Sequence, residues 1–323
     1  MKHARLNIKN KLTAALLSLS LALLMLPMLR SCKNDESPVS DVVFRDALGR
    51  EVGIDKNPER VAALLGSFAD VWRLSGGELC AAPEDAEEDF GIDLSHAVNI
   101  GGAHSPNVEL LLSSDPDLVL ASASTASHVA LLDTLSAAGI TVAYFDVDNF
   151  YDYLAMLDLC TDITGRKDLY KAHGSDLAEE IDEIKSLYQE ILDSQGEERV
   201  LILRAASSFV KAKGSTGTVL GEMLADMGCV NIADNDGTLL DNLSVESVIK
   251  NQPHRIFIVI MGNDEAAAMA SINNMLKENA AWGTLEAVEE GRIYVMDKSL
   301  FNLKPNSRWK DAYELLFEKL TEK

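Results

Sequence analysis

Short apolar runs rich in β-branched residues alternate along most of the chain with amphipathic segments of helical spacing. Runs of this length are typical of buried strands. Six of them stand out, at residues 61–65, 118–122, 141–147, 200–203, 256–260 and 293–296. Strands that are separated by helices usually form parallel sheets. The pattern therefore predicts an α/β protein with central, mainly parallel sheets.

The pattern changes between residues 150 and 195, which contain no strand-like run and no proline. Over residues 166–195 the apolar positions recur at helical spacing, and acidic residues surround them, as on a solvated helix face. A coiled coil is the alternative, but too few heptads persist and α/β units flank the segment on both sides. We expect a long helix that joins two lobes. The expected N-terminal lobe covers residues 42–149, the helical connector 150–195 and the C-terminal lobe 196–323.

A repeated unit supports two lobes of similar architecture. In the first copy Glu109 opens a short predicted helix and Pro116 follows seven residues later; Glu246 and Pro253 repeat this spacing in the second copy. A proline at this position stops the helix just before an apolar strand. Each lobe is thus expected to carry the unit once.

Residues 1–31 have the features of an export signal. Residues 1–12 contain four basic residues and no acidic one, and residues 13–29 are almost wholly apolar, as in an n-region followed by an h-region. A membrane-spanning helix is the alternative, but it needs about 20 apolar residues, and this run has 17 and contains Pro27. The segment ends in Leu29-Arg30-Ser31-Cys32, which resembles the lipobox of bacterial lipoproteins, although Arg30 departs from the usual small or apolar residue. Cys32 would then be acylated as the new N-terminus, and residues 32–41 would form a flexible tether. Ordinary secretion and an uncleaved anchor are the alternatives.

The protein is strongly acidic. Its net charge is −22, and residues 32–323 hold 24 basic and 51 acidic residues, a net charge of −27. Such a chain repels nucleic acid and anionic lipid, so we expect no nucleic-acid partner and membrane attachment only through the lipid on Cys32.

Cys80, Cys160 and Cys229 lie far apart without a C-x-x-C motif, which favours buried free thiols over a disulfide framework.

The order of several motifs resembles the long-helix (class III) substrate-binding proteins of ABC importers, the receptors for ferric siderophores, heme and cobalamin. These motifs are the lipobox, Asp46-x-x-Gly49-Arg50-Glu51-Val52, Pro58-Glu59-Arg60-Val61, Gly101-Gly102-x-x-x-Pro106-Asn107-x-Glu109, Pro116-Asp117-Leu118-Val119, the bridging helix and residues 282–295. The resemblance implies a monomer with two lobes joined by a rigid helix, without an intrinsic cofactor, that binds iron only as part of a chelate. It also implies a permease dimer as partner, with Glu109 and Glu246 meeting arginines of that permease.

In such a fold the ligand lies beyond the carboxyl ends of the strands. The predicted loops there include residues 101–107, 205–218 and 299–309. The candidate ligand-binding residues on or beside such loops are Phe68, Trp72, His104, Arg204, Phe209, Lys211, Lys213, Phe301, Lys304, Arg308 and Trp309. Scattered basic residues usually mark a solvated face, but here they cluster near aromatic residues, which suits a large, flat, anionic chelate. A ferric siderophore is therefore the leading ligand, with heme and cobalamin as alternatives.

Other chemistries fit the sequence less well. The histidines show no metal-ligand spacing, so we expect no bare-metal site, while His104 as an axial heme ligand is a further hypothesis. The chain contains no G-x-S-x-G and no G-x-G-x-x-G motif, and the segment from Lys213 to Gly217 lacks the lysine of a phosphate-binding loop. We therefore expect a lipid-anchored extracytoplasmic receptor and not an enzyme. An extracytoplasmic hydrolase is the alternative from a different class.

Overall fold

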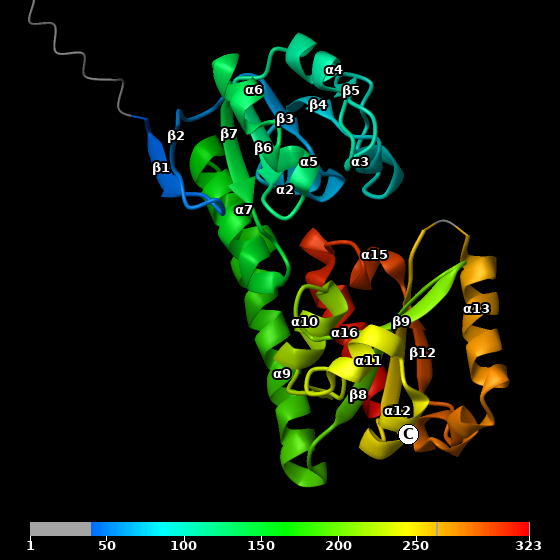
Figure 1. Ribbon diagram of the computed structural model, residues 1–323. Helices are drawn as coiled ribbons and strands as arrows, with labels where there is room; N and C mark the ends of the chain where they lie inside the picture. Colours follow the sequence, from blue (N-terminus) through cyan, green and yellow to red (C-terminus); the bar gives the residue numbers. More distant parts are fainter. Residues whose placement is uncertain (1–39, 263, 323) are drawn as a thin grey trace, which may run out of the picture. The chain divides into compact units, whose positions relative to one another are not determined.

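Figure 1 shows the computed structural model of the chain, which describes residues 40–262 and 264–322. Two separate sheets, formed by different parts of the chain, organise these residues. The first sheet has the strand order β5-β4-β3-β6-β7, and all its pairs are parallel. The predicted export signal, Cys32 and all but the end of the predicted tether lie outside the described residues.

The second sheet has the order β10-β8-β11-β12, also with parallel pairs, and β9 pairs antiparallel with β8. The strands are β3 (Val61–Ala63), β4 (Leu79–Ala82), β5 (Val98–Asn99), β6 (Leu118–Ser122), β7 (Thr141–Phe145), β8 (Arg199–Ala206), β9 (Phe209–Lys213), β10 (Val230–Asn231), β11 (Arg255–Ile260) and β12 (Ile293–Met296). All six predicted strands are present. The prediction of an α/β fold with mainly parallel sheets is confirmed.

A small antiparallel hairpin precedes the first sheet. It consists of β1 (Val42–Arg45) and β2 (Glu51–Ile54). The buried carboxylate of Asp46 holds the turn, because it accepts hydrogen bonds from the backbone N–H groups of Leu48 (3.1 Å) and Arg50 (2.9 Å) and pairs with the Arg50 guanidinium. Arg50 also donates to the carbonyl of Val142, at 2.8 Å, which ties the hairpin to β7.

Helices connect the strands in both halves of the chain. Those between the strands of the first sheet are α2 (Gly66–Leu74), α3 (Asp85–Glu88), α4 (Val108–Ser113), α5 (Ala126–Val129) and α6 (Leu132–Ala137). Those that accompany the second sheet are α10 (Val219–Asp226), α11 (Gly237–Asn242), α12 (Val245–Asn251), α13 (Glu265–Glu278), α14 (Glu286–Glu289), α15 (Lys298–Phe301) and α16 (Trp309–Thr321), with 3₁₀ turns at Ala280–Thr284 and Asn306–Arg308.

The predicted long helix is present as a continuous helical stretch, with one local change of geometry. It runs through α8 (Lys167–Tyr170), a π turn (Lys171–Ser175) and α9 (Asp176–Gln195), and α7 (Phe150–Thr164) precedes it. A π turn disturbs the regular pairing of backbone carbonyls. Here the Tyr153 hydroxyl on α7 donates to the His173 carbonyl at 2.7 Å, which gives this carbonyl a partner. The π turn was not predicted from the sequence.

The largest apolar cluster includes side chains from both sheets and from the helices between them. Leu118 of β6, Val200 of β8, Ile181 of α9 and Trp309 of α16 all belong to it. The rings of Trp309 and Phe150 lie 5.7 Å apart at their centroids. Because one buried cluster spans α7, α9 and α16, the connector shares its core with both sheets.

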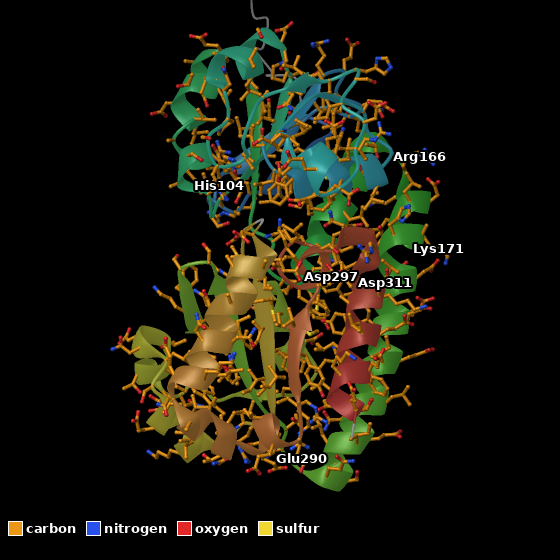
Figure 2. All side chains as sticks on the ribbon, turned by 90° about the vertical axis from the view of Figure 1, so that its right-hand side faces the viewer. His104, Arg166, Lys171, Glu290, Asp297 and Asp311 are labelled. Atoms are coloured by element: carbon orange, nitrogen blue, oxygen red, sulfur yellow. The ribbon has the colours of Figure 1, made fainter. Side chains whose placement is uncertain are left out.

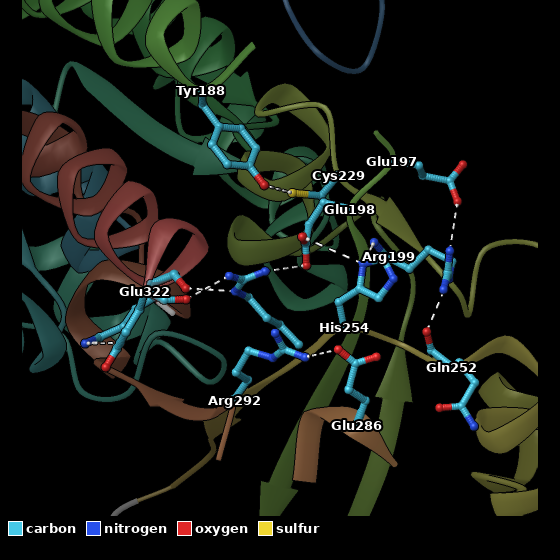
Figure 3. A network of polar contacts seen from close by, with 12 residues as sticks. Tyr188, Glu197, Glu198, Arg199, Cys229, Gln252, His254, Glu286, Arg292 and Glu322 are labelled. Atoms are coloured by element: carbon cyan, nitrogen blue, oxygen red, sulfur yellow. Dashed lines mark hydrogen bonds and ion pairs between the residues drawn. The ribbon is translucent and has the colours of Figure 1, made fainter. Parts of the chain in front are cut away.

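A buried charge network fastens the amino end of β11 to the end of α16 (Figure 3). Arg255, only 7% exposed, pairs with Glu198 at 2.8 Å. It also donates to the carbonyls of Lys319 and Glu322, both at 3.0 Å. The ion pair and the two carbonyl acceptors offset the free-energy cost of removing this guanidinium from water.

Asn306 links the segment after β12 to the first helix of the N-terminal half. This buried residue has a φ of 52°, which asparagine tolerates better than most residues. Its amide nitrogen donates to the carbonyl of Ser67 at 2.9 Å and to the carboxylate of Asp70 at 2.8 Å. These acceptors are largely buried, so loss of the amide would leave them without this donor.

The substitution Asn306→Gly is expected to lower the free energy of unfolding by about 1–3 kcal/mol, the cost of leaving buried acceptors unpaired. Glycine keeps the positive φ without strain. Urea denaturation followed by circular dichroism measures the change. Asn302→Gly is the matched control, because Asn302 makes no side-chain hydrogen bond within the described residues. An equal loss in both variants would contradict the assigned role of Asn306.

Candidate functional site

Three basic side chains share one face of the hairpin formed by β8 and β9. The residues after position 205 were predicted to form a loop, and this is wrong for residues 209–213, which return as strand β9. Arg204 lies directly opposite Lys211, and Ile202 opposite Lys213. Directly opposed residues of an antiparallel pair, and residues two apart on a strand, lie on the same face. Arg204, Lys211 and Lys213 therefore form one positive surface, called here the cationic hairpin face.

In the described part of the chain, nothing balances the charges of the cationic hairpin face. Within residues 40–262 and 264–322, none of the three has an ion pair or a side-chain hydrogen bond. Burial lowers the pKa of Arg204 below its usual value. Burial also lowers the pKa of Lys213, and the charges of Arg204 and Lys211 lower it further. Partly desolvated cations that repel one another favour an anionic ligand.

An aromatic ring stands beside these cations. The Lys211 ammonium lies 5.6 Å from the ring centroid of Phe209, which is 37% exposed. This is within the range of a cation–π contact. Of the predicted aromatic ligand contacts, Phe209 thus keeps an accessible face next to a positive charge.

The other predicted aromatic contacts lie in the core and offer almost no surface to a ligand. Their exposed fractions are 1% for Phe68, 2% for Trp72, 1% for Phe301 and 0% for Trp309. The Trp72 indole N–H donates to the carbonyl of Glu78 at 2.8 Å. The structure therefore corrects the expectation that these four side chains contact a ligand, and gives them a packing role instead.

The predicted basic residues of the 299–309 segment have acidic groups nearby. Arg308 pairs with Asp311 at 3.3 Å and donates to the Ser299 hydroxyl at 3.3 Å. Lys304 is half-buried. Burial lowers its pKa, while the charges of Asp148 and Asp146 act in the opposite direction. These two cations differ from the cationic hairpin face, because their charges are partly balanced by the chain itself.

His104 lies on the exposed loop of residues 101–107 at the carboxyl end of the first sheet (Figure 2). The loop begins at Gly101, whose φ is 83° and whose N–H donates to the Asn99 side chain at 2.8 Å. It ends where the N–H of Asn107 donates to the Ile100 carbonyl, at 2.7 Å. The predicted position of His104, on a loop that follows a strand, is thus found.

The repeated unit is present in both halves. Asn107 caps α4 by accepting from the N–H of Leu110 at 3.1 Å, and Ser244 caps α12 by accepting from the N–H of Ser247 at 3.4 Å. Each helix is followed by a residue with positive φ, Asp115 (50°) or Gln252 (42°), then by the proline and a central strand. The predicted glutamates occupy the second position of these helices and are exposed.

A cavity of about 680 Å³ lies beside the second of these glutamates. Glu246, Glu278, Phe209, Ser244 and Trp282 are among its lining residues. The Ser244 hydroxyl donates to Glu246 at 3.0 Å. Hydrogen bonds from its own backbone N–H and from Ser244 lower the pKa of Glu246, which keeps it ionised.

The cysteines, the metal-binding side chains and the helices of the described residues limit the kinds of site this part of the chain can form. Cys80, Cys160 and Cys229 are free thiols. Burial raises the pKa of Cys160 to about 12 and, as the largest effect, that of Cys229 to about 12, so both are poor nucleophiles. Across residues 40–262 and 264–322 no cluster of three His, Cys, Asp or Glu side chains is arranged to hold a metal ion. In the same residues, every helix is too short or too polar to cross a membrane.

The sequence matches a family model described as periplasmic binding protein over residues 77–300. Among curated proteins, the Fe(3+)-citrate-binding protein YfmC of Bacillus subtilis is 26% identical over 300 residues, which cover 90% of this chain and 90% of the relative. A putative ABC transporter substrate-binding lipoprotein, YhfQ of the same organism, is 22% identical over 85% of this chain and 86% of the relative.

Solved structures have the same fold. The complex of Staphylococcus aureus SirA with staphyloferrin B superposes with a TM-score of 0.69 at 19% identity, over 86% of this chain and 98% of SirA. The siderophore-binding protein BauB, solved with acinetobactin and ferric iron, gives a TM-score of 0.69 at 20% identity, over 87% of this chain and 99% of BauB.

Proposed function

We propose, from the premise that this chain belongs to the periplasmic binding protein family, that it captures an anionic ferric chelate for an ABC importer. The cationic hairpin face is the observation that carries this proposal, because three cations with no ion pair among the described residues stand together in a chain of net charge −22. The ligands named for the relatives support iron as the cargo, since one binds ferric citrate and another was solved with a ferric siderophore.

The chemistry of the face favours a chelate that carries several negative charges. Arg204 and Lys213 have lost part of their hydration and also repel each other, so an anion would relieve both costs. Guanidinium groups bind carboxylates in two-pronged contacts, and ammonium groups act as point charges. A ferric complex with free carboxylate groups meets these requirements better than a neutral or cationic hydroxamate complex.

Heme is the second candidate ligand, because of the exposed His104. An imidazole on an exposed loop is a suitable axial ligand for heme iron, and the two heme propionates would suit the cationic hairpin face. Cobalamin is the third candidate within the family.

A binding panel distinguishes these ligands. Purified residues 32–323 are expected to bind ferric citrate saturably, and a ferric hydroxamate of net positive charge more weakly, because the cationic hairpin face repels it. Thermal shift and tryptophan fluorescence quenching would measure binding of these two, hemin and cobalamin. A response to hemin alone would replace the siderophore proposal by heme. Turnover of a chromogenic ester or glycoside would favour a hydrolase.

The proposed cellular arrangement follows from the same function. The lipid on Cys32 would hold the receptor at the outer side of the membrane, because the acidic body offers no electrostatic attraction to anionic lipid. The receptor would work as a monomer and deliver its ligand to a permease dimer. Glu109 and Glu246 are the proposed contacts with that permease.

A further inference from the structure

His128 is a buried histidine next to the His104 loop. It lies on α5, just after β6, and its exposed fraction is 0%. Its Nδ1 accepts a hydrogen bond from the backbone N–H of Ser122 at 3.2 Å. Its Nε2 lies 2.6 Å from the carbonyl oxygen of Ala103. A carbonyl oxygen only accepts, so Nε2 carries the proton and Nδ1 is free of one. The two contacts together require the neutral Nε2–H imidazole.

These two hydrogen bonds join segments that are distant in the sequence. Ser122 ends β6, whereas Ala103 stands in the 101–107 loop immediately before His104. The backbone of His128 is also fixed, because the Tyr144 hydroxyl on β7 donates to its carbonyl at 2.7 Å. The imidazole thus forms a hydrogen-bonded bridge between the first sheet and an exposed loop.

A second proton on the ring would break the hydrogen bond from the Ser122 N–H. The imidazolium has two N–H donors and no acceptor, so its Nδ1–H would point at the Ser122 N–H instead of accepting from it. Burial lowers the pKa of His128 below its ordinary value of 6.5, and the Ala103 carbonyl partly opposes this effect. The titratable groups placed against His128 are His104 on the loop and Tyr144 on β7. A charged His104 lowers the pKa of His128 further.

We propose that His128 is a positioning residue for ligand capture: its neutral ring pins the 101–107 loop to β6, and a second proton on the ring releases this loop and the bound chelate. The proposal rests on the proposed function, because it assumes that the loop faces the ligand. It adds a way to release the ligand: protonation of His128 frees the 101–107 loop from β6, and the cations that contact the ligand take no part.

The sign of the pH effect follows from the neutral folded state. A histidine whose pKa is lowered by folding binds its proton more readily in the unfolded chain. The stability that His128 contributes is therefore complete above pH 6.5 and falls as the pH decreases through the lowered pKa. Ligand affinity is expected to fall once the folded ring itself binds the proton, at and below this lowered pKa, by up to about tenfold per pH unit for a single linked proton.

The test has one part that needs no ligand. Nitrogen-15 NMR of the mature protein at pH 7.5 is expected to show the His128 ring as neutral, with the proton on Nε2 and none on Nδ1. Amide hydrogen exchange at Ser122 is expected to accelerate as this ring titrates. A ring protonated on Nδ1 at pH 7.5, or a Ser122 amide indifferent to the titration, would overturn the proposal.

The other part measures affinity for ferric citrate from pH 7.5 to 4.5. The wild type is expected to lose affinity at acid pH, whereas His128→Gln, whose amide cannot titrate, should have a flatter profile. The exposed His96→Gln is the matched control and should keep the wild-type profile. An unchanged slope in His128→Gln would refute the proposal, and if that variant does not fold, the NMR experiment decides. Absence of ferric citrate binding at every pH would contradict the proposed function, not the ring assignment.

Discussion

Replacing Arg204 by glutamine is expected to weaken ferric citrate binding by about ten- to a hundredfold, which corresponds to the loss of one charge-assisted hydrogen bond of about 1.5–3 kcal/mol. Arg204 is the most buried member of the cationic hairpin face, so its charge is the least screened by water. Isothermal titration calorimetry gives the affinity, and Lys277→Gln, an exposed charge on α13, is the control for the change in net charge.

The same variant should separate binding from stability. Arg204 and Lys213 repel each other in the free protein, and burial further disfavours both charges. Arg204→Gln should therefore unfold at the same temperature as the wild type or higher, although its affinity is lower. Loss of both stability and affinity would indicate that Arg204 supports the fold and not the ligand. Addition of Lys213→Gln should weaken binding further, with an effect that is not additive because the two cations interact.

The contrast between the two groups of predicted cations shows what the sequence could not provide. Both groups were selected because basic residues stood near aromatic ones. The structure gives Arg308 an acidic partner, Asp311, whereas Arg204 has none among the described residues. Pairing depends on which side chains the fold brings together, and one sequence does not contain that information. The sequence therefore identified the basic residues, but it did not show which of them would have an acidic partner.

The fold itself was largely predictable because its signals are local. Continuous apolar runs marked the buried parallel strands, and helical spacing marked the connector. Strand β9 was missed because the two-residue turn before it is Ser207-Ser208, without the glycine or asparagine that usually marks a hairpin. The π turn at residues 171–175 was missed because one of its carbonyls, that of His173, is paired with a hydroxyl from another helix, that of Tyr153.

The buried aromatic residues show that a place just after a strand is not enough to predict ligand contact. Phe68 and Trp72 follow β3, where loops often contact ligands, but they are four residues apart on α2 and therefore share one face of the helix. That face packs inward, and helical spacing was the signal that favoured burial over ligand contact. His128 had no comparable signal, because its partners, Ser122 and Ala103, are backbone groups that any residue would supply.

The two exposed glutamates occupy equivalent places in the two halves. Each stands in the first turn of a short helix that leads through a proline into a central strand, β6 or β11. The helix dipole favours an acid in a first turn and explains either residue alone. Their equivalence is instead what a partner with two similar subunits would require, because each half of the receptor must then present the same group.

The double substitution Glu109→Ala, Glu246→Ala is expected to reduce ferric citrate uptake to background while affinity for the chelate stays unchanged. Truncating one member of a desolvated interfacial charge pair costs about 2–5 kcal/mol, so two such losses would prevent productive docking. Uptake of radioactive iron by cells carrying the permease and each receptor variant measures the effect, and binding to the purified permease tests its cause.

The matched control removes two other exposed first-turn acids, Asp133 and Glu289, and should leave uptake intact. It carries the same change in net charge, and Asp133, the second residue of α6, has a similar helix-dipole contribution of about 0.3–1 kcal/mol. Reduced uptake in the control as well would indicate that overall charge, and not the position of Glu109 and Glu246, governs delivery. Weaker chelate binding in the Glu109→Ala, Glu246→Ala variant would place these residues at the ligand site and remove them from the permease interface.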